Sequence, residues 1–221
     1  MRRAETVLIL AATPLEAARL NAPQVVITGI GAVNTAYALT KYLLTQPRPS
    51  LVIQTGIAGA YVPGGLSVEA VALATSETYG DVGVLTPQGW RPADEIGIPL
   101  VDADGARPAR FNEFPLDPEL VARAAAVCGS LVAATGPFLT VSTVTGVRAR
   151  GDELHQRFGA LCESMEGAAA AHVCALHDVP FLEVRGVSNL VEDRNRAAWK
   201  IVEAAAAAQM VALRLAENLE P

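Results

Sequence analysis

Short runs of consecutive apolar residues alternate along the chain with longer stretches in which apolar and polar residues recur at helical spacing. The apolar runs are continuous, which is typical of strands covered on both faces of a mostly parallel sheet. The predicted strands span residues 7–12, 25–28, 51–55, 67–75, 131–135, 140–143, 160–164 and 181–187. The predicted helices span residues 14–20, 32–44, 118–127, 147–158, 165–177 and 197–218. This order of elements predicts a three-layer α/β/α fold with a mostly parallel, mixed central sheet.

The length of the chain sets the number of domains that we expect. The 221 residues, 51% of them hydrophobic, suffice for one α/β domain with a sizeable core. Residues 76–118 are rich in Gly and Pro and lack a periodic pattern, so we expect loops that leave the sheet. The chain has no internal repeat and no low-complexity linker. We therefore expect residues 1–221 to form a single domain.

Charge and cysteine content narrow the class of partner. A net charge of −6 argues against nucleic acid or an anionic membrane as partner. No stretch is both apolar and long enough to span a bilayer, and the basic residues 1–3 precede a buried strand rather than a signal sequence. Cys128, Cys162 and Cys174 are odd in number and lack CxxC spacing, which indicates reduced thiols. We expect a cytoplasmic protein with a small-molecule partner.

Four features follow predicted strands, at the sheet edge where open α/β sheets bind their ligands. They are Glu16, a turn at residues 56–60, Glu166 and Asn189. Each has a structural alternative. Glu16 completes a capping box with Thr13, and a helix dipole favours Glu166 at a helix start. The small residues of the turn suit a tight connection, and Asn189 suits a cap or a turn. Taken singly, these features leave both interpretations open.

Other motifs point away from metals and organic cofactors. Gly29-Ile30-Gly31 lacks the third glycine of the dinucleotide-binding fingerprint. His172 and His177 are five residues apart, the wrong spacing for two ligands on one helix face, so we expect them and His155 to be structural or surface histidines. The chain contains neither a nucleophile-elbow motif nor a P-loop.

Five segments together match one known family in order and spacing. They are residues 29–31 ahead of a helix, 55–59 (Thr-Gly-Ile-Ala-Gly), 137–139 (Pro-Phe-Leu), 163–174 with its Met-Glu-Gly core, and 184–189 (Val-Arg-Gly-Val-Ser-Asn). The chain resembles the nucleoside phosphorylase/hydrolase superfamily, and within it the branch of the methylthioadenosine/S-adenosylhomocysteine nucleosidases. The resemblance implies a nucleoside phosphorylase-like fold and cleavage of the N-glycosidic bond of a purine nucleoside, with no metal and no cofactor.

Position 189 and the segment after it refine this resemblance. The adenine-specific nucleosidases normally carry Asp where this chain has Asn189. In this position the chain resembles enzymes that handle 6-oxopurines, which carry Asn. Residues 188–199 also look like those of the futalosine hydrolases, which release hypoxanthine in menaquinone biosynthesis. The resemblance therefore implies futalosine as substrate, with hypoxanthine and dehypoxanthinyl futalosine as products. The segment from Glu16 to Thr28 is shorter than is usual in the family, so what closes that side of the pocket is not predicted.

The resemblance also implies roles for individual side chains. Glu166 would accept hydrogen bonds from the ribose hydroxyls, with Met165 under the sugar. Glu16 would orient and deprotonate the attacking water. Asn189, with Ser188 beside it, would grip N7 and O6 of the purine. Cleavage through an oxocarbenium-like state calls for a carboxylate and a leaving-group stabiliser on opposite sides of the sugar carbon.

Further binding residues follow from the same resemblance. The backbone around Ile57, Ala58 and Gly59 would line the sugar and the water, and Phe138 and Leu139 would sandwich or edge the purine. Futalosine carries an aromatic carboxylate on its 5′ side. Arg194 and Arg196 are the candidates for binding that anion.

Three other functions stay open. A purine nucleoside phosphorylase would need arginines near the sugar, and residues 56–60 supply none, while Arg19 is ambiguous. A methylthioadenosine nucleosidase is disfavoured by Asn189. A non-catalytic purine-binding module is disfavoured by the presence of both Glu16 and Glu166. The apolar closing helix and the loops at residues 102–115 favour a homo-oligomer, a dimer or larger.

Overall fold

The computed structural model describes residues 6–22, 24–105 and 107–219. The strands are β1 (Val7–Ala11), β2 (Val25–Ile27), β3 (Leu51–Tyr61), β4 (Val71–Tyr79), β5 (Gly83–Thr86), β6 (Gly89–Pro92), β7 (Glu113–Pro115), β8 (Ala134–Thr140), β9 (Cys162–Ser164) and β10 (Phe181–Val191). The helices are α1 (Pro14–Ala17), α2 (Ala32–Thr45), α3 (Pro118–Cys128), α4 (Arg148–Phe158), α5 (Gly167–Leu176) and α6 (Ile201–Asn218).

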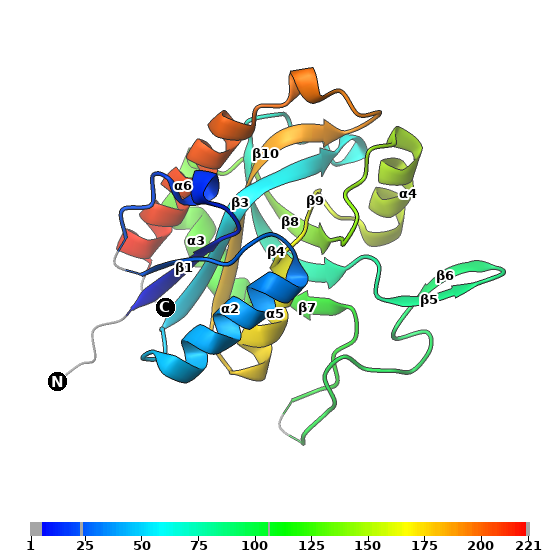
Figure 1. Cartoon of the computed structure of the whole chain (residues 1–221), viewed down its shortest axis with the longest axis horizontal. Coiled ribbons are helices and arrows are strands. Elements are labelled where there is room, and N and C mark those ends of the chain that lie inside the picture. Colours follow the sequence, from blue (N-terminus) through cyan, green and yellow to red (C-terminus); the bar gives the residue numbers. More distant parts are fainter. Residues whose placement is uncertain (1–5, 23, 106, 220–221) are drawn as a thin grey trace.

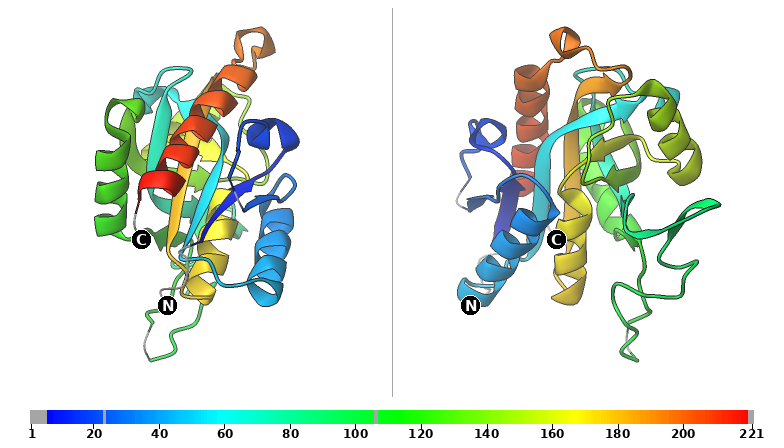
Figure 2. Two further views of the ribbon diagram at one scale, coloured as in Figure 1. Left: turned by 90° about the vertical axis from the view of Figure 1, so that its left-hand side faces the viewer. Right: turned by 45° about the vertical axis from the view of Figure 1, so that its right-hand side comes forward.

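The elements form three layers, as the hydrophobic pattern predicts. Helices α2 and α5 cover one face of the central sheet, and α3 and α6 cover the other (Figure 2). The core between the layers is built from apolar strand residues such as Leu8–Leu10 and Leu51–Ile53, which are fully buried. Among the described helices, none combines the length and the apolar character needed to cross a bilayer.

The central sheet is mixed and mostly parallel, which confirms the predicted fold class. Strand β3 pairs in parallel with β1 and β10, and β8 pairs in parallel with β4 and β9. Antiparallel pairs join β10 to β4 and β3 to β9. The pairings therefore run in a closed circuit, from β3 through β10, β4, β8 and β9 back to β3. The carboxyl half of β3 therefore pairs with β10 and with β9, and these pairings were not predicted from the sequence.

Two predicted breaks in the strands are wrong. The predicted turn at residues 56–60 lies inside β3, which pairs with β10 on one side and β9 on the other. The small residues serve close packing rather than a turn, because a Cβ at Gly56 would lie 2.5 Å from Glu16 Oε1 and 2.6 Å from Arg185 Nη1. Likewise, in place of the two strands predicted at residues 131–135 and 140–143 there is one strand, β8, which spans the predicted break and ends at Thr140.

Strand β8 contains Pro137, which lacks the N–H group that a central strand needs. Its partner β4 shifts register between Ala74 and Ser76, directly opposite Pro137. The carbonyl of Thr75, the residue skipped at this bulge, accepts the Leu116 N–H group instead. The bulge thus accommodates the proline without breaking the sheet.

The predicted loop region at residues 76–118 is partly ordered into strands. Strand β4 continues to Tyr79, β7 pairs with its end, and β5 and β6 form a hairpin that projects away from the sheet (Figure 1). Trp90 in this hairpin contacts Phe158 of α4, with ring centroids 5.9 Å apart. The prediction that this region leaves the sheet therefore holds only between Gly80 and Asn112.

Candidate active site

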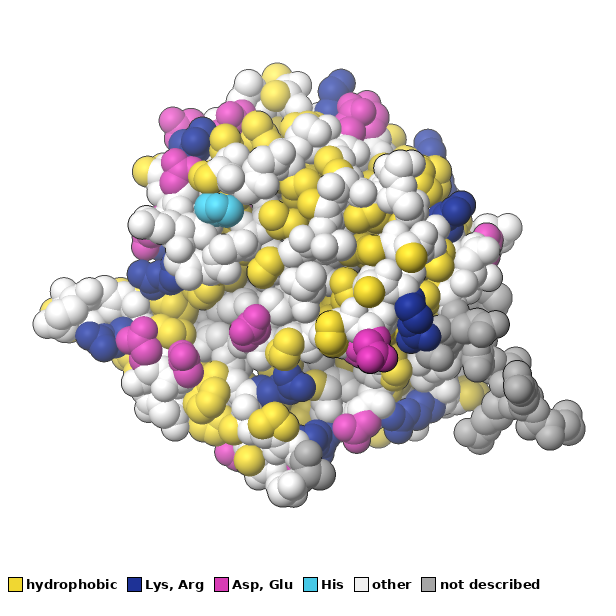
Figure 3. Space-filling model, turned by 180° about the vertical axis from the view of Figure 1, so that it is seen from behind, with side chains coloured by type: hydrophobic (Ala, Val, Ile, Leu, Met, Phe, Trp, Pro, Cys, Tyr) yellow, Lys and Arg dark blue, Asp and Glu magenta, His cyan; other side chains and the backbone are white. Residues whose placement is uncertain are grey.

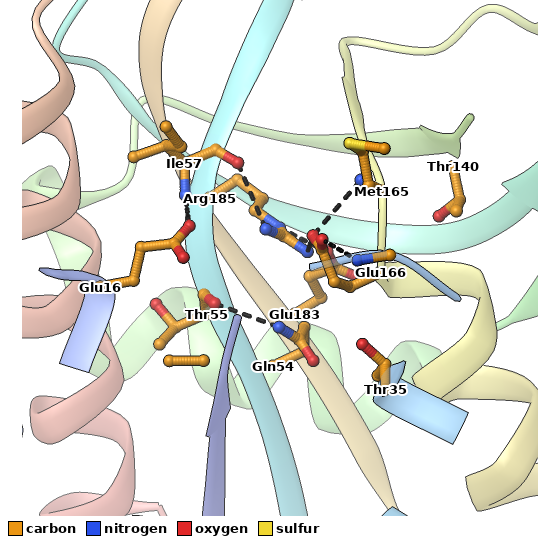
Figure 4. Close-up of polar contacts among 12 residues, drawn as sticks. Glu16, Thr35, Gln54, Thr55, Ile57, Thr140, Met165, Glu166, Glu183 and Arg185 are labelled. Atoms are coloured by element: carbon orange, nitrogen blue, oxygen red, sulfur yellow. Dashed lines mark hydrogen bonds and ion pairs between the residues drawn. The ribbon is translucent and has the colours of Figure 1, made fainter. Parts of the chain in front are cut away.

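Glu16 is held in place by the start of α1 and by the backbone of β3. Thr13 is the N-cap of α1, and its hydroxyl accepts the Glu16 N–H group at 3.3 Å while donating to Glu16 Oε2 at 2.7 Å. The other carboxylate oxygen accepts the Ile57 N–H group at 2.9 Å (Figure 4). The predicted capping box is thus only half formed, because the Glu16 carboxylate turns toward β3 instead of the Thr13 N–H group. The side chain is 4% exposed and free of a purely local role.

Arg185 on β10 contacts the carbonyl group of the same residue of β3. Its Nη1 donates to the carbonyl of Ile57 at 3.2 Å. Glu16 and Arg185 therefore fix the donor and the acceptor of one residue at the carboxyl half of β3. Arg185 lies within a segment that matches the family, but no role was predicted for it. It is 1% exposed, and a buried arginine with distant partners is not recognised from the sequence pattern.

Glu166 joins three parts of the chain. Its Oε1 accepts the Gly31 N–H group at the start of α2 at 2.9 Å. Its Oε2 accepts the Met165 N–H group at 3.3 Å and forms an ion pair with Arg185 Nη2 at 3.2 Å. Glu166 is the N-cap residue of α5, but its carboxylate binds the N-terminus of α2 instead of capping its own helix. It is 4% exposed, so the contacts replace the water that a charged group requires.

The charges around Arg185 do not cancel. Besides Glu166, its Nε donates to Glu183 Oε1 at 2.7 Å. Burial alone lowers the pKa of Arg185, but Glu183, Glu166 and Glu16 outweigh burial, and the net effect raises the pKa. Arg185 therefore stays charged. One guanidinium faces three carboxylates, which gives this part of the site an excess of negative charge.

Asn189 and Ser188 lie at a bulge near the end of β10, within the strand that was expected to stop at Val187. Ser188 Oγ lies 3.2 Å from the Ala58 carbonyl and 2.8 Å from Asn189 Oδ1. Asn189 Nδ2 donates to the Leu190 carbonyl at 3.0 Å, and a Cβ at Gly59 would lie 3.2 Å from Nδ2. The bulge places both polar side chains against the Ala58–Gly59 segment of β3.

Most of the predicted residues thus gather along β3. Glu16, Ile57, Met165 and Glu166 surround Arg185, as Figure 4 shows. Ser188 and Asn189 contact the next two residues of β3. A carboxylate on each side of Ile57 and an amide beside Gly59 form an arrangement that can hold a sugar and a water molecule near a heterocyclic base.

Comparison with known proteins fits this geometry. The family model of the phosphorylase superfamily matches residues 8–219. The chain belongs to the phosphorylase superfamily. The futalosine hydrolase of Streptomyces coelicolor is 38% identical over 190 residues, which cover 86% of this chain and 74% of that protein. The futalosine hydrolase of Thermus thermophilus is 37% identical over 188 residues, or 85% of this chain and 78% of that protein.

A solved structure supports the same fold. The methylthioadenosine/S-adenosylhomocysteine nucleosidase of Neisseria meningitidis, in complex with methylthio-immucillin-A, superimposes with a TM-score of 0.80 at 21% identity. The alignment covers 97% of this chain and all of that chain. This structure confirms the predicted nucleoside phosphorylase-like fold, and the family model confirms the superfamily.

The predicted role of two residues needs correction. Phe138 and Leu139, expected to sandwich or edge the purine, are 1% and 0% exposed and lie in the apolar clusters on either side of β8. Their side chains present no free surface to a base. Residues 137–139 fell between two predicted strands, whereas the bulge in β4 allows them to continue a single strand.

The loop after β8 lies closer to the site than β8 itself. Glu163 on β9 accepts the Thr145 N–H group at 2.6 Å and the Thr145 hydroxyl at 2.7 Å, and also the Tyr61 hydroxyl at 2.9 Å. Its Cγ would lie 3.8 Å from a Cβ at Gly59, the glycine that Asn189 also faces. Glu163 therefore ties the loop at residues 141–147 to the part of β3 beside Asn189. The sequence analysis missed Glu163, because a lone carboxylate in a short strand gives no signal.

Arg194 contacts the same loop, and Arg196 shares the Trp199 ring with Arg194. The Arg194 N–H group donates to the Gly146 carbonyl at 3.3 Å. Both guanidinium groups stack on Trp199, at 5.0 and 5.9 Å from the ring centroid. Both arginines are exposed. They form a cationic edge next to the loop that Glu163 anchors.

The short segment after Glu16 is bound by the last helix, α6. Gln209 of α6, which is 2% exposed, accepts the Arg19 N–H group at 2.6 Å and donates to the Leu15 carbonyl at 3.3 Å. These bonds hold the short segment against α6. Arg19, the ambiguous candidate for an anion site, is thus bound through its backbone.

The remaining predictions concern histidines, cysteines and metals. His155 Nδ1 lies 2.8 Å from the Ala160 carbonyl, and His172 stacks on Phe114, so both are structural as predicted. The three cysteines are free and buried, as predicted. Within residues 6–22, 24–105 and 107–219, no group of three or more His, Cys, Asp or Glu side chains is arranged to hold a metal ion.

Proposed function

We propose that this chain hydrolyses the N-glycosidic bond of futalosine and releases hypoxanthine, a step of menaquinone biosynthesis. The observation that carries the proposal is the pair of buried carboxylates, Glu16 and Glu166, on the two sides of Ile57 and Arg185. The futalosine hydrolase relatives support the choice of substrate.

Glu166 is the group that binds the ribose hydroxyls in this proposal. Its carboxylate is fixed by Gly31, Met165 and Arg185, so it is already oriented before a substrate arrives. A preorganised acceptor costs no reorganisation when positive charge develops on the sugar.

Glu16 is the general base. Its Oε1 lies on the Ile57 N–H group and its Oε2 on the Thr13 hydroxyl, which leaves lone pairs of both oxygens available to a water molecule. As the bond from C1′ of the ribose to N9 of the purine breaks, C1′ becomes positive, and the water attacks C1′ and transfers its proton to Glu16. The purine leaves with the electron pair of the broken bond and takes up a proton at N7 from water.

Water rather than phosphate is the nucleophile, for an electrostatic reason. The only guanidinium at the described centre, Arg185, is already surrounded by Glu16, Glu166 and Glu183. A phosphate dianion would enter a region with excess negative charge, with no free cation to bind it. Water carries no such penalty.

Asn189 and the loop at residues 141–147 form the base side of the proposed site. The Asn189 carboxamide offers one donor and one acceptor, which match O6 and a protonated N7 of hypoxanthine. Ser188 orients the amide through its 2.8 Å contact with Oδ1. Arg194 and Arg196 supply positive charge for the 5′ carboxylate of futalosine. In this proposal, replacing either arginine by Ala raises KM for futalosine more than for inosine.

Product analysis by chromatography tests the proposal. The wild-type protein is incubated separately with futalosine, methylthioadenosine and inosine, each with and without phosphate. We expect hypoxanthine from futalosine at the same rate in both buffers. A rate that depends on phosphate, or adenine release from methylthioadenosine as the dominant reaction, would contradict the proposal.

The exposed apolar side chains support a further proposal, a homo-oligomer. Leu85 on the hairpin is 80% exposed and Ile98 in the following loop is 61% exposed. The reverse face of the molecule carries groups of hydrophobic side chains among interspersed acidic and basic ones (Figure 3). Helix α6 packs its buried residues against the sheet of its own chain, so the hairpin and loops are the better contact surface. Light scattering coupled to gel filtration measures the oligomer directly.

A further inference from the structure

Two fully buried carboxyl groups lie behind the proposed site and have no part in the mechanism above. Glu77 on β4 and Glu183 on β10 are both 0% exposed. Glu77 Oε2 accepts the Thr140 hydroxyl at 2.7 Å, and Glu183 Oε1 accepts Arg185 Nε at 2.7 Å. Each group is thus satisfied through one oxygen.

The two remaining oxygens face one another. Among the described residues, Glu77 Oε1 and Glu183 Oε2 have no donor of their own. A Cβ at Gly167, the first residue of α5, would overlap both of these oxygens. Only glycine therefore allows α5 to start against this pair.

A hydrogen bond between two carboxyl groups requires a proton, because an ionised carboxylate can only accept. Burial, the charge of Glu183 and a hydrogen bond to Glu183 all raise the pKa of Glu77, in that order of size. The Thr140 hydroxyl and the charge of Arg185 lower the pKa by less. Two full negative charges on these neighbouring, buried carboxyl groups would repel strongly, and one proton removes that repulsion.

We propose that Glu77 and Glu183 share one proton, and that the resulting acid–carboxylate pair is a positioning device for the sugar-binding carboxylate Glu166. The protonated Glu77 donates to Glu183, Glu183 holds the Arg185 guanidinium, and Arg185 holds Glu166. The role of Glu166 in this proposal rests on the proposed function, whereas the shared proton does not.

The N-terminus of α5 completes the connection. The Ala168 N–H group donates to Thr140 Oγ1 at 2.7 Å, and the Thr140 hydroxyl donates to Glu77. A continuous row of hydrogen bonds and one ion pair therefore runs from α5 through Thr140, Glu77, Glu183 and Arg185 to Glu166. Because every member is buried, a change in charge at Glu77 is felt at Glu166 with little screening.

Other titratable groups near the Glu77–Glu183 pair, apart from Arg185, are either uncharged or exposed to solvent. Burial, and then the charges of Glu77 and Glu183, raise the pKa of the Cys162 thiol on β9. Burial and Glu77 also raise the pKa of Tyr79 on β4. Burial lowers the pKa of His172 on α5, which contacts the Tyr79 hydroxyl. These three groups therefore stay neutral near neutral pH, and Glu113 on β7 and Glu119 on α3 are exposed to solvent.

The pair predicts an alkaline limit to activity. At a pH below the pKa of the pair, the shared proton is present and Glu183 holds the Arg185 guanidinium in place. Above it both carboxylates are charged, they repel each other, and the arrangement of Arg185 and Glu166 loosens. In Glu77→Gln the amide donates to Glu183 and accepts from Thr140, as the protonated acid does, but it cannot ionise. We expect the wild type to show an alkaline fall in kcat/KM and this variant to lose it.

Glu183→Gln has the opposite consequence. It removes the carboxylate that holds Arg185, so we expect kcat/KM to fall about tenfold to a hundredfold at neutral pH, the range for a lost hydrogen bond to a charged group. A merely structural role for both residues would lower the activity of both variants alike, without a change in the shape of the pH profile.

Infrared spectroscopy of the protein without substrate tests the proton directly. The wild type at neutral pH should show the carbonyl band of a protonated carboxylic acid. The band should be lost in Glu77→Gln and kept in the control Glu119→Gln, which alters an exposed carboxylate. A wild type without the band, or a band that survives in a folded Glu77→Gln protein, would overturn the shared proton. An alkaline limb unchanged in Glu77→Gln would overturn the positioning role. Failure to cleave futalosine, with the band present, would instead refute the proposed function.

Discussion

At the scale of single residues, the site depends on groups whose contacts reach beyond their own element. Glu16 is the first case. From the sequence, its position three residues after Thr13 fits a local cap as well as catalysis. In the structure its Oε1 lies 2.9 Å from the Ile57 N–H group, 41 residues away in the chain, and the local bond to the Thr13 N–H group is not made. A side chain that gives up a local bond for a distant one is better explained by function.

Replacing Glu16 with Gln tests this role. The amide oxygen can still accept the Ile57 N–H group, so the fold should be retained. Loss of a general base typically lowers the rate by about 10²–10⁴. We expect kcat for futalosine to fall by that amount with little change in Tm. Near-normal turnover at an unchanged Tm would leave Glu16 with a structural role alone.

Asn189 is expected to set the choice of base. An Asp at this position cannot donate to O6 of a 6-oxopurine unless it is protonated, so one polar pair is lost. An unpaired buried polar group costs about 1–3 kcal/mol, which corresponds to about 5-fold to 150-fold. Asn189→Asp should therefore lose most activity on hypoxanthine nucleosides and gain some on adenine nucleosides. Values of kcat/KM for futalosine and its 6-amino counterpart measure the change, and an unaltered ratio would remove Asn189 from the base site.

His172 makes stability depend on pH. Burial lowers the pKa of His172, which stacks on Phe114 with ring centroids 4.6 Å apart. The unfolded chain then binds a proton more readily than the native protein. The contribution to stability is complete above the unfolded pKa of about 6.5 and is lost as pH falls from there through the lowered native pKa.

The Tm of the wild type at about pH 7.5 and about pH 5.5 checks this sign, because the interval includes the ordinary pKa of His. We expect His172→Gln to lose less stability over this interval than the wild type. His177→Gln serves as the matched control on the same helix. An equal loss in the wild type and His172→Gln would show that other groups carry the acid sensitivity.

At the scale of elements, hydrophobic patterning locates strands and helices well but misplaces their ends at the site. Val7–Ala11 and Leu51–Ile53 are continuous apolar runs, and both are strands as predicted. The predicted ends at Thr55 and Val187 fall short, because β3 and β10 continue together as far as Tyr61 and Val191. Small and polar residues look like a turn in sequence, yet here they are strand residues packed against Glu16, Arg185 and each other. Pairing between distant strands, which decides this, leaves no local signal.

The residues that the sequence did not reveal share one property. Arg185, Glu163 and Gln209 act on backbone groups or side chains far away in the chain, and each is almost completely buried. Patterns within one element cannot identify their partners. The candidates found from the sequence, such as Glu166 and Asn189, stand next to strand ends, where the general position of ligand sites in α/β proteins is informative.

Helix α6 is predicted to control the position of Glu16 through Gln209. Gln209→Leu removes the bonds to the Arg19 N–H group and the Leu15 carbonyl, and losing them should destabilise the protein by about 1–3 kcal/mol. Because Glu16 lies between these two residues, kcat should fall as well. Met210→Leu, at a neighbouring and half-exposed position, is the control. A folded Gln209→Leu protein with wild-type kcat would separate α6 from the site.

At the scale of the whole molecule, the closed circuit of strands explains why so many chain segments converge. Strand β3 is paired with β1, β9 and β10, so residues from near both ends of the chain meet along its carboxyl half. Glu16 comes from the segment after β1, Glu166 from the segment after β9, and Arg185 and Asn189 from β10. More carboxylates than cations surround Arg185, and this excess of negative charge favours a neutral nucleophile, water, over phosphate.

The most direct test of this account compares the wild-type protein on two matched substrates in phosphate-free buffer. The measurement is kcat/KM for futalosine and for the same molecule with an amino group in place of O6. In the proposed site Asn189 takes the place of the acid that would protonate adenine. We therefore predict clear preference for futalosine, with hypoxanthine as the released base. Preference for the 6-amino compound would contradict both the assignment of Asn189 and the proposed substrate.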